Sequence, residues 1–279
     1  MVTPAKAGVL LFHLFFSCLL LALPDVPSFN DCEDLVFNAG FQDDSQPSNG
    51  LGGSFPGAFA RIIISQGQAR SYYVSIPPDY DPLVASPLLF TWHGAGGAGT
   101  AQAFAIAHRD FWQPTGDINN FIVVAQESTG PTGGWVPSVD FLILADILDD
   151  MNNRYNIEQT RIYGHGFSSG GHAMHGLMLQ NSSTYAAYVI SAGVLEGFAG
   201  LAAPANANRI IPLYVSIGNN DTSGPNLNML THSNHVIFNN AGWVDNQTYW
   251  LDEFIGGHEI EAQVRSKSWD KICTFSNLQ

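Results

Sequence analysis

The 279-residue sequence is poor in basic residues and in cysteine. Ten lysines and arginines stand against 24 aspartates and glutamates, which gives a formal net charge of −14 at pH 7. A surface of that sign repels nucleic acid and anionic membranes, so neither is expected as a partner. Three cysteines are too few for a zinc cluster, and no metal site is expected. No internal repeat divides the chain, and its length suits one large domain.

The first segment of the chain has the composition of a secretory signal peptide. Lys6 precedes the apolar run VLLFHLFFSCLLLAL, and small residues follow in DVPSF. The run is shorter than the ~20 residues that a spanning helix needs, which disfavours the alternative of an uncleaved membrane anchor. We therefore expect cleavage before Phe29, with residues 1–28 removed and residues 29–279 forming a single domain. The mature protein is expected to be a monomer, extracellular or periplasmic, and free of the membrane.

Removal of the signal peptide would leave two cysteines near opposite ends of the mature chain, Cys32 and Cys273. In an oxidising compartment the simplest expectation is that they form a disulfide that ties the two ends together. The alternative is a pair of unrelated free thiols.

Strand-like and helix-like segments alternate along the rest of the chain. Residues 29–57 are polar and rich in Gly and Pro, as in a loop. Strand patterns cover residues 69–82, 88–99, 121–128, 161–166, 185–193, 210–218 and 247–257, and helix patterns cover residues 138–155, 168–180, 227–242 and part of 258–273. Strands that are apolar on both faces and alternate with helices predict an α/β fold with a mostly parallel central sheet and helices on both faces. Ligands of such sheets bind at the carboxyl ends of the strands.

One glycine-rich junction between a strand and a helix has the pattern G-x-S-x-G. It reads Gly166-Phe167-Ser168-Ser169-Gly170, and centring it on Ser168 places glycine two residues before and two after the serine. A nucleophile elbow needs small residues at both positions, because the tight turn brings their backbone against neighbouring chain. Centring on Ser169 would place Phe167 where a side chain clashes. Ser168 is therefore the candidate nucleophile, and the alternative is a Gly-rich turn capped by serines.

An elbow predicts an acid and then a histidine, each in a loop after a later strand. Asp221 follows the strand pattern IIPLYVSIG, and His258 follows the paired glycines that end YWLDEFIGG. The order Ser168, Asp221, His258 is the one that a catalytic triad on this fold requires. The alternatives are an Asn/Asp turn and a loop histidine without a catalytic role. Asp245 and Asp252 are rival acids, in a polar turn and within a predicted strand.

The cluster HGAGG at residues 93–97 follows an earlier strand, where a second oxyanion donor is expected. We expect the backbone N–H groups of Ala95 and Ser169 to form the oxyanion hole, unless the cluster is only a structural turn. The residues expected to line the substrate site are His93, Gly94, Trp135 and Phe167. For Trp135, in a Gly/Pro loop, structural packing is an equal alternative.

The remaining histidines have no expected role in the chemistry. His172 and His175 lie one helical turn apart, but no further ligand is placed to complete a metal site with them. His165 lies in the strand before the elbow and is expected to be a core histidine. No cofactor is needed for the chemistry that the serine, acid and histidine predict.

With these residues in view, the chain resembles the secreted polyhydroxybutyrate depolymerases and feruloyl esterases of the α/β-hydrolase fold. The matching stretches are RSYYVSIPPDYDP, LLFTWHGAGGAG, residues 138–176, PLYVSIGNND and GGHEIE. The resemblance implies a serine carboxylic ester hydrolase that works through an acyl-enzyme, with Ser168, Asp221 and His258 as its triad. Its expected partner is an ester substrate: a polyhydroxyalkanoate polyester or oligomer, or a feruloyl or acetyl ester of the plant cell wall.

Three features depart from the pattern of this family. Ala95 replaces a frequent cysteine, no Trp-Pro follows His258, and no Ser/Thr-rich linker leads to a polymer-binding module. A crystalline polyester is therefore not assured as the substrate. The alternatives to an esterase are a serine peptidase on the same fold, which would normally carry a propeller or cap-sized insertion, and a non-catalytic binding scaffold.

Overall fold

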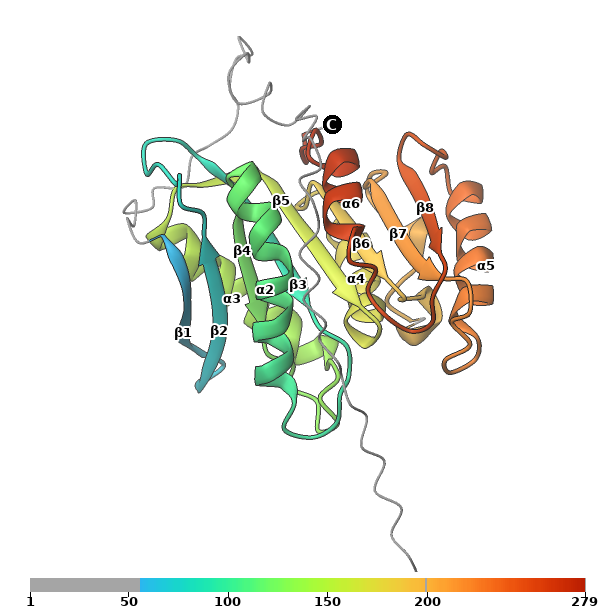
Figure 1. Cartoon of the computed structure of the whole chain (residues 1–279), viewed down its shortest axis with the longest axis horizontal. Coiled ribbons are helices and arrows are strands. Elements are labelled where there is room, and N and C mark those ends of the chain that lie inside the picture. The colour runs from blue at the N-terminus through green and yellow to red at the C-terminus, as the bar shows by residue number, and fades with distance from the viewer. Residues whose placement is uncertain (1–55, 199, 279) are drawn as a thin grey trace, which may run out of the picture.

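The computed structural model describes residues 56–198 and 200–278 (Figure 1). The predicted signal peptide and Cys32 lie outside the described residues. Within them, one eight-stranded sheet has the order β1-β2-β4-β3-β5-β6-β7-β8. The strands are β1 (Gly57–Ser65), β2 (Gln68–Ile76), β3 (Ser86–Trp92), β4 (Ile122–Gln126), β5 (Ile157–Phe167), β6 (Ala187–Ser191), β7 (Leu213–Gly218) and β8 (Tyr249–Phe254).

The sheet is antiparallel at one edge and parallel across the rest. β1 pairs antiparallel with β2 and β2 with β4, whereas every other pairing is parallel. All residues of β3, β4, β6 and β7 are buried, because helices cover both faces of these strands. Because β5, β6, β7 and β8 run parallel to one another, the carboxyl ends of β5, β7 and β8 lie at the same edge of the sheet.

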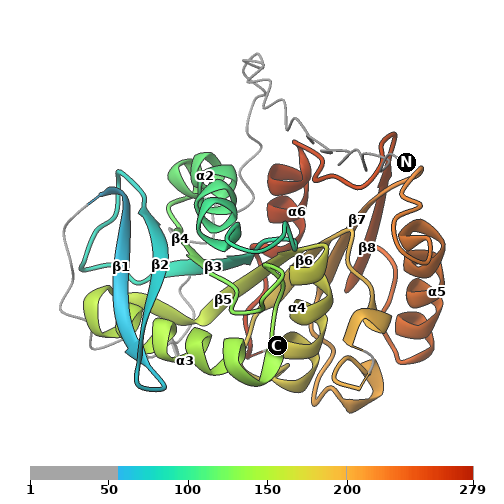
Figure 2. The ribbon, with the colours of Figure 1, turned by 90° about the horizontal axis from the view of Figure 1, so that it is seen from below.

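The described chain has five helices, which are divided between the two faces of the sheet (Figure 2). They are α2 (Ala101–Asn119), α3 (Pro137–Arg154), α4 (Ser169–Gln180), α5 (Leu227–Asn240) and α6 (Val264–Ile272), with short 3-10 turns at Leu195–Phe198 and Pro204–Asn206. α2 and α6 cover one face and α3 and α4 the other, and α5 packs on the side of α4. The helix predicted over residues 138–155 is observed as α3, which buries Leu144, Leu148 and Met151 on one face. The predicted α/β fold with a mostly parallel sheet and helices on both faces is confirmed.

Two elements of the fold have no counterpart among the predicted segments. β1 is an edge strand whose residues alternate between half-buried and exposed, so it lacks the continuous apolar run of the inner strands. α2 carries Pro114 in its interior and Gly116 close to its end, two residues that normally argue against a helix. Tertiary packing of buried residues such as Trp112 overrides that local preference.

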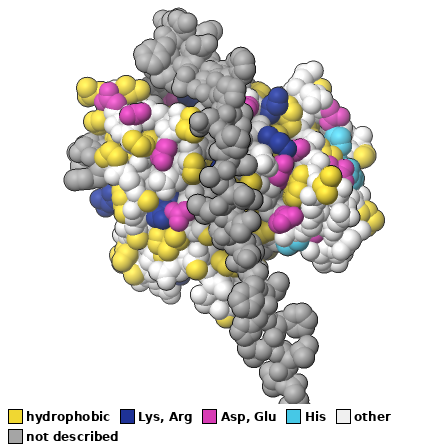
Figure 3. All heavy atoms as spheres, viewed as in Figure 1, with side chains coloured by type: hydrophobic (Ala, Val, Ile, Leu, Met, Phe, Trp, Pro, Cys, Tyr) yellow, Lys and Arg dark blue, Asp and Glu magenta, His cyan; other side chains and the backbone are white. Residues whose placement is uncertain are grey.

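The surface in Figure 3 mixes acidic, basic and apolar side chains, and no basic patch is seen on the part of that face that the coloured atoms show. Among the helices of residues 56–198 and 200–278, none has the length and apolarity needed to cross a membrane. Cys273 is fully buried at the end of α6. Since its predicted partner Cys32 is not among the described residues, the disulfide stays a prediction.

Candidate active site

Ser168 sits on a strained turn between β5 and α4. Its φ of 51° and ψ of −120° lie where a residue with a side chain is rarely found. A Cβ atom at Gly170 would come within 2.4 Å of the Trp92 carbonyl oxygen, and one at Gly166 within 2.6 Å of the Gly170 carbonyl oxygen. Both glycines are therefore needed for the close approach of backbone that the turn requires. The spacing of the G-x-S-x-G pattern has this steric cause.

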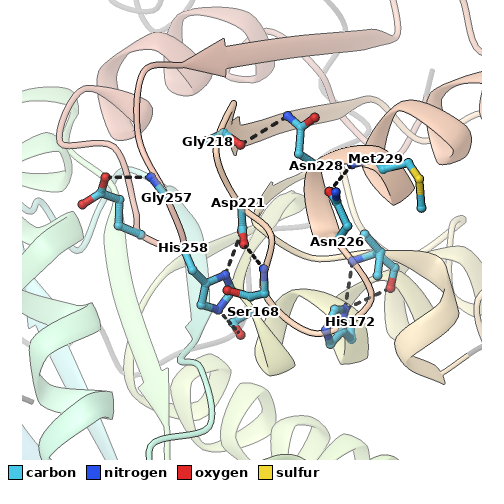
Figure 4. Close-up of polar contacts among 12 residues, drawn as sticks. Ser168, His172, Gly218, Asp221, Asn226, Asn228, Met229, Gly257 and His258 are labelled. Atoms are coloured by element: carbon cyan, nitrogen blue, oxygen red, sulfur yellow. Dashed lines mark hydrogen bonds and ion pairs between the residues drawn. The ribbon is translucent and has the colours of Figure 1, made fainter.

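The side chains of Ser168, His258 and Asp221 form one hydrogen-bonded chain (Figure 4). The Ser168 Oγ to His258 Nε2 distance is 2.8 Å, and the His258 Nδ1 to Asp221 Oδ2 distance is also 2.8 Å. Because a carboxylate can only accept, the Nδ1–H of His258 donates this hydrogen bond to Asp221. Nε2 of the neutral imidazole is then free to accept from the serine hydroxyl. The three residues come from the ends of β5, β8 and β7 in turn.

Backbone contacts at the end of β7 fix the position of Asp221. The carboxylate is fully buried, and its second oxygen, Oδ1, accepts the backbone N–H of Ser223 at 3.0 Å. The backbone carbonyl of Asp221 accepts the N–H of Asn228 at 3.0 Å, which ties the loop to the first turn of α5. A Cβ atom at Gly218 would lie 2.3 Å from the Gly257 carbonyl oxygen, so glycine there lets the loop of His258 approach β7.

The two rival acids lie in other hydrogen-bonding groups. Asp252 accepts from the Tyr214 hydroxyl at 2.7 Å and from Lys267 Nζ at 3.0 Å, which joins β8 to α6. Asp245 accepts from His235 Nε2 at 2.6 Å. Neither of these contacts involves His258, and the structure brings Asp221 alone of the three acids to its imidazole.

The predicted oxyanion donors Ala95 and Ser169 both lie next to Gly134. A Cβ atom at Gly134 would be 3.2 Å from Ser169 Oγ and 3.5 Å from the Ala95 Cβ. Ser169 is also the first residue of α4, so its backbone N–H points out of the positive end of the helix. No residue of the loop 128–134 was among the predicted site residues. The glycine pair directly before Trp135 is the sequence feature that could have indicated this close approach.

The side chains of His93 and Trp135, two of the residues predicted to line the substrate site, are buried, and their contact with a substrate stays a prediction. His93 is fully buried, with Nδ1 2.8 Å from the Gly94 carbonyl oxygen and Nε2 3.4 Å from the Ser128 nitrogen. Burial lowers the pKa of His93 and favours its neutral form. Trp135 is buried, stacks on Trp92 at 4.5 Å and donates from Nε1 to the His93 carbonyl at 2.7 Å. The packing alternative for Trp135 is the one observed.

Gly94 and Phe167 are in contact with the triad. A Cβ atom at Gly94 would lie 3.0 Å from the Phe167 ring and 3.2 Å from the Ser168 Cβ, so the HGAGG loop passes directly beside the nucleophile. The half-buried ring of Phe167 stacks on the imidazole of His258 with centroids 5.2 Å apart. Phe167 therefore restricts the orientation of His258, a contact that the sequence does not reveal.

His172 and His175 have separate packing roles on α4. The Val194 N–H donates to His172 Nδ1 at 2.8 Å, and burial lowers the pKa of His172. His175 is buried, and its Nδ1 lies 3.3 Å from the Tyr188 hydroxyl. In the part of the chain that the structure describes, no three His, Cys, Asp or Glu side chains are grouped so that they could hold a metal ion.

Comparisons with known proteins support the fold and an esterase resemblance. A bifunctional acetylxylan esterase/xylanase from Neocallimastix patriciarum is 28% identical over 158 residues, 56% of this chain and 22% of that protein. This chain thus spans about a fifth of that relative. The ferulic acid esterase of Anaeromyces mucronatus, solved with ferulic acid, has a TM-score of 0.59 at 16% identity over 82% of this chain and 94% of its own.

A candidate dipeptidyl aminopeptidase IV from Bacteroides ovatus has a TM-score of 0.60 at 15% identity, over 78% of this chain and 35% of its own. No protein-family model matches the chain. At such identities the solved structures establish the fold alone. The chain has the α/β-hydrolase fold, and the predicted resemblance to feruloyl esterases is confirmed.

Proposed function

We propose that the protein is a serine carboxylic ester hydrolase that works through an acyl-enzyme. The observation that supports this most is the chain from Ser168 Oγ to His258 to the buried Asp221, with 2.8 Å at each step. A serine hydroxyl is a weak nucleophile until a base takes its proton, and His258 Nε2 is placed to take it. Asp221 holds the imidazole in the required tautomer and stabilises the imidazolium that forms.

Each step of the reaction uses a group in the site. As Ser168 Oγ bonds to the ester carbonyl carbon, its proton moves to His258 Nε2 and the carbonyl oxygen becomes an oxyanion. The N–H groups of Ala95 and Ser169 donate to that oxygen. The bond to the alcohol then breaks, and the alcohol leaves with the proton from His258. Water then attacks the acyl carbon while His258 takes its proton, the bond to Ser168 Oγ breaks, and His258 returns the proton to Oγ as the acid leaves. No cofactor takes part.

We propose feruloyl or acetyl esters of the plant cell wall as the substrate class. The support is the activity for which the similar proteins are named, an acetylxylan esterase/xylanase and a ferulic acid esterase. Hydroxyalkanoate oligomers and polyesters are the second candidate substrate class. We also propose that residues 29–279 act as one secreted monomeric domain after removal of residues 1–28, which N-terminal sequencing and sizing of the exported protein would test.

The decisive experiment is ester hydrolysis by the purified protein and by Ser168→Ala. The substrates are p-nitrophenyl acetate, butyrate and octanoate, methyl ferulate, a polyhydroxybutyrate suspension and a peptide amide panel. We expect Ser168→Ala to lose about three or more orders of magnitude in kcat, whereas Ser233→Ala, an exposed serine on α5, keeps the wild-type rate. An unchanged rate in Ser168→Ala would overturn the assignment of the nucleophile. Cleavage of amides alone would indicate a peptidase, and no reaction at all a binding scaffold.

A further inference from the structure

The strained backbone of Ser168 is held by hydrogen bonds of its own peptide groups. Its carbonyl accepts the N–H of His172 at 2.9 Å, which is an ordinary helical bond of α4. Its N–H donates to the carbonyl oxygen of Ser191 at 2.9 Å, which links the turn after β5 to the neighbouring strand β6. The second bond keeps Ser168 in place only if Ser191, the last residue of β6, is itself fixed.

The Ser191 side chain is held by hydrogen bonds within a group of four buried polar side chains. We call this group the histidine layer, and its members are Thr91, His108, His165 and Ser191. His165 Nε2 lies 3.2 Å from Ser191 Oγ, and His165 Nδ1 lies 2.9 Å from Thr91 Oγ1. Thr91 Oγ1 is in turn 3.3 Å from His108 Nδ1. The layer thus connects side chains of β3, β5, β6 and α2 directly below the elbow.

The sheet register explains why these side chains meet. Thr91 of β3 pairs with His165 of β5, and His165 pairs with Val189 of β6, two residues before Ser191. Paired residues point to the same face, so all three polar side chains project toward α2, which supplies His108. His165 and Thr91 are fully buried. Polar groups removed from water are held firmly when each has a partner, and here both ring nitrogens of His165 face a hydroxyl.

His165 is a neutral hydrogen-bonding group in this position. Burial lowers its pKa to about 3, and burial also holds the pKa of His108 well below its ordinary value. The His165 ring is clamped between aromatic neighbours, with Trp112 at 5.1 Å and His108 at 5.8 Å between centroids. The ring therefore has little freedom to turn, and the Ser191 hydroxyl it binds is fixed with it.

The histidine layer also reaches the base of the triad. The His108 ring lies 6.1 Å from the ring of Phe167, and Phe167 stacks on His258 at 5.2 Å. Phe167 thus connects His108 of the histidine layer to the imidazole of His258.

We propose that His165 is a positioning residue for the nucleophile: it fixes Ser191, whose carbonyl holds the N–H of the strained Ser168. This inference rests on the proposed function, because it gives the layer a purpose only if Ser168 is the nucleophile. A buried histidine that served packing alone would be replaceable by an apolar residue of similar size without loss of rate.

Four variants test the inference. His165→Leu removes both hydrogen bonds and keeps bulk, His165→Gln keeps a donor and an acceptor, and Ser191→Ala removes only the hydroxyl. His175→Leu is the matched control, since His175 is also buried, also faces a hydroxyl and has a pKa lowered to about 3 by burial, but its hydroxyl partner is Tyr188 and not a residue of the histidine layer. Each variant is assayed for kcat, KM, Tm and the rate at which a fluorophosphonate labels Ser168.

We expect His165→Leu to lower kcat and the labelling rate by about 10- to 100-fold, with KM within about twofold, because a small displacement of the nucleophile weakens attack more than binding. His165→Gln should recover part of that loss, and Ser191→Ala should lose about 3- to 10-fold. His175→Leu should lower Tm as much as His165→Leu but keep kcat. If His165→Leu fails to fold, Ser191→Ala and His165→Gln still decide the question.

Two results would overturn different claims. If the wild type labels rapidly and His165→Leu and Ser191→Ala label at the same rate, the positioning role is wrong and the layer is packing. If the wild type neither labels nor hydrolyses any ester, the proposed function itself fails. The labelling rate keeps these outcomes apart because it requires a nucleophilic serine but no natural substrate.

Discussion

Two histidine–aspartate pairs in residues 56–278 have almost the same nitrogen-to-oxygen distance but very different surroundings. His258 Nδ1 lies 2.8 Å from Asp221 Oδ2, and His235 Nε2 lies 2.6 Å from Asp245 Oδ1. Asp221 is fully buried, whereas the Asp245 side chain is 52% exposed. The free ring nitrogen of His258 faces the Ser168 hydroxyl. The hydrogen bonds of His235 with Asp245 and with Asn239, at 3.1 Å, both use Nε2. A short distance between an imidazole and a carboxylate therefore does not make a catalytic pair.

The two pairs differ in two respects. The acid is buried in one pair and exposed in the other, and only in the pair of His258 does the ring nitrogen that is not bonded to the acid face a serine hydroxyl. A buried carboxylate acts on its imidazole through a low dielectric, while an exposed one is screened by water and salt. His235 also stacks on Tyr249 at 4.8 Å, which suits a surface contact that attaches α5 to β8. The comparison predicts that equal changes in the two pairs have very unequal effects.

The largest effect is expected from removing the charge of each acid. Asp221→Asn should lower kcat by about 10³- to 10⁴-fold, because the amide can donate to Nδ1 and turn the imidazole into the wrong tautomer. Asp245→Asn should leave kcat within about twofold. Steady-state kinetics on p-nitrophenyl acetate would measure both, and comparable losses in the two variants would contradict the distinction.

A smaller effect on kcat is expected from replacing the glycine that lies three residues before each acid. In Gly218→Ala the new Cβ would lie 2.3 Å from the Gly257 carbonyl oxygen, which should push the His258 loop away from Asp221 and lower kcat by about 10- to 100-fold. Gly242→Ala places a side chain at φ 105°, close to Asp245, and should cost about 1 kcal/mol or more of stability without changing kcat. Thermal melts and kinetics on both variants would show whether the two effects separate.

The smallest effect is a pH dependence of stability at the exposed pair. The hydrogen bond from His235 holds the pKa of Asp245 below its ordinary value. A carboxyl whose folded pKa is lowered stabilises the fold above its unfolded pKa, and that contribution is lost as the pH falls through the folded value. Between pH 7 and pH 3 the wild type should therefore lose about 1 °C more in Tm than Asp245→Asn. An equal loss in both would show that the pair contributes nothing measurable.

The sequence was sufficient to predict much of the site because steric and topological rules are local. Gly166 and Gly170 are required by backbone approach around Ser168, so the elbow can be found from five residues. Asp221 and His258 follow from the order of strands, since the carboxyl ends of parallel strands meet at one edge. The inner strands were predictable because burial on both faces leaves continuous apolar runs.

The rest depends on contacts between residues far apart in the sequence. Whether His93 faces substrate or core is decided by Trp135 and Ser128, and nothing in the HGAGG loop itself reveals them. His165 could be predicted as a core histidine, but its bonds to Thr91 and Ser191 follow from the register of three strands. α2 escaped prediction because the packing of Trp112 outweighs the cost of Pro114.

The triad draws on the ends of β5, β7 and β8, while β6 between them contributes to the elbow through the carbonyl of Ser191. Loops of the described chain that carry none of these three residues can therefore change in length or composition without altering the strand ends that position them. Such a division would let natural selection, or a protein engineer, change which molecules the site accepts while Ser168, Asp221 and His258 keep their geometry.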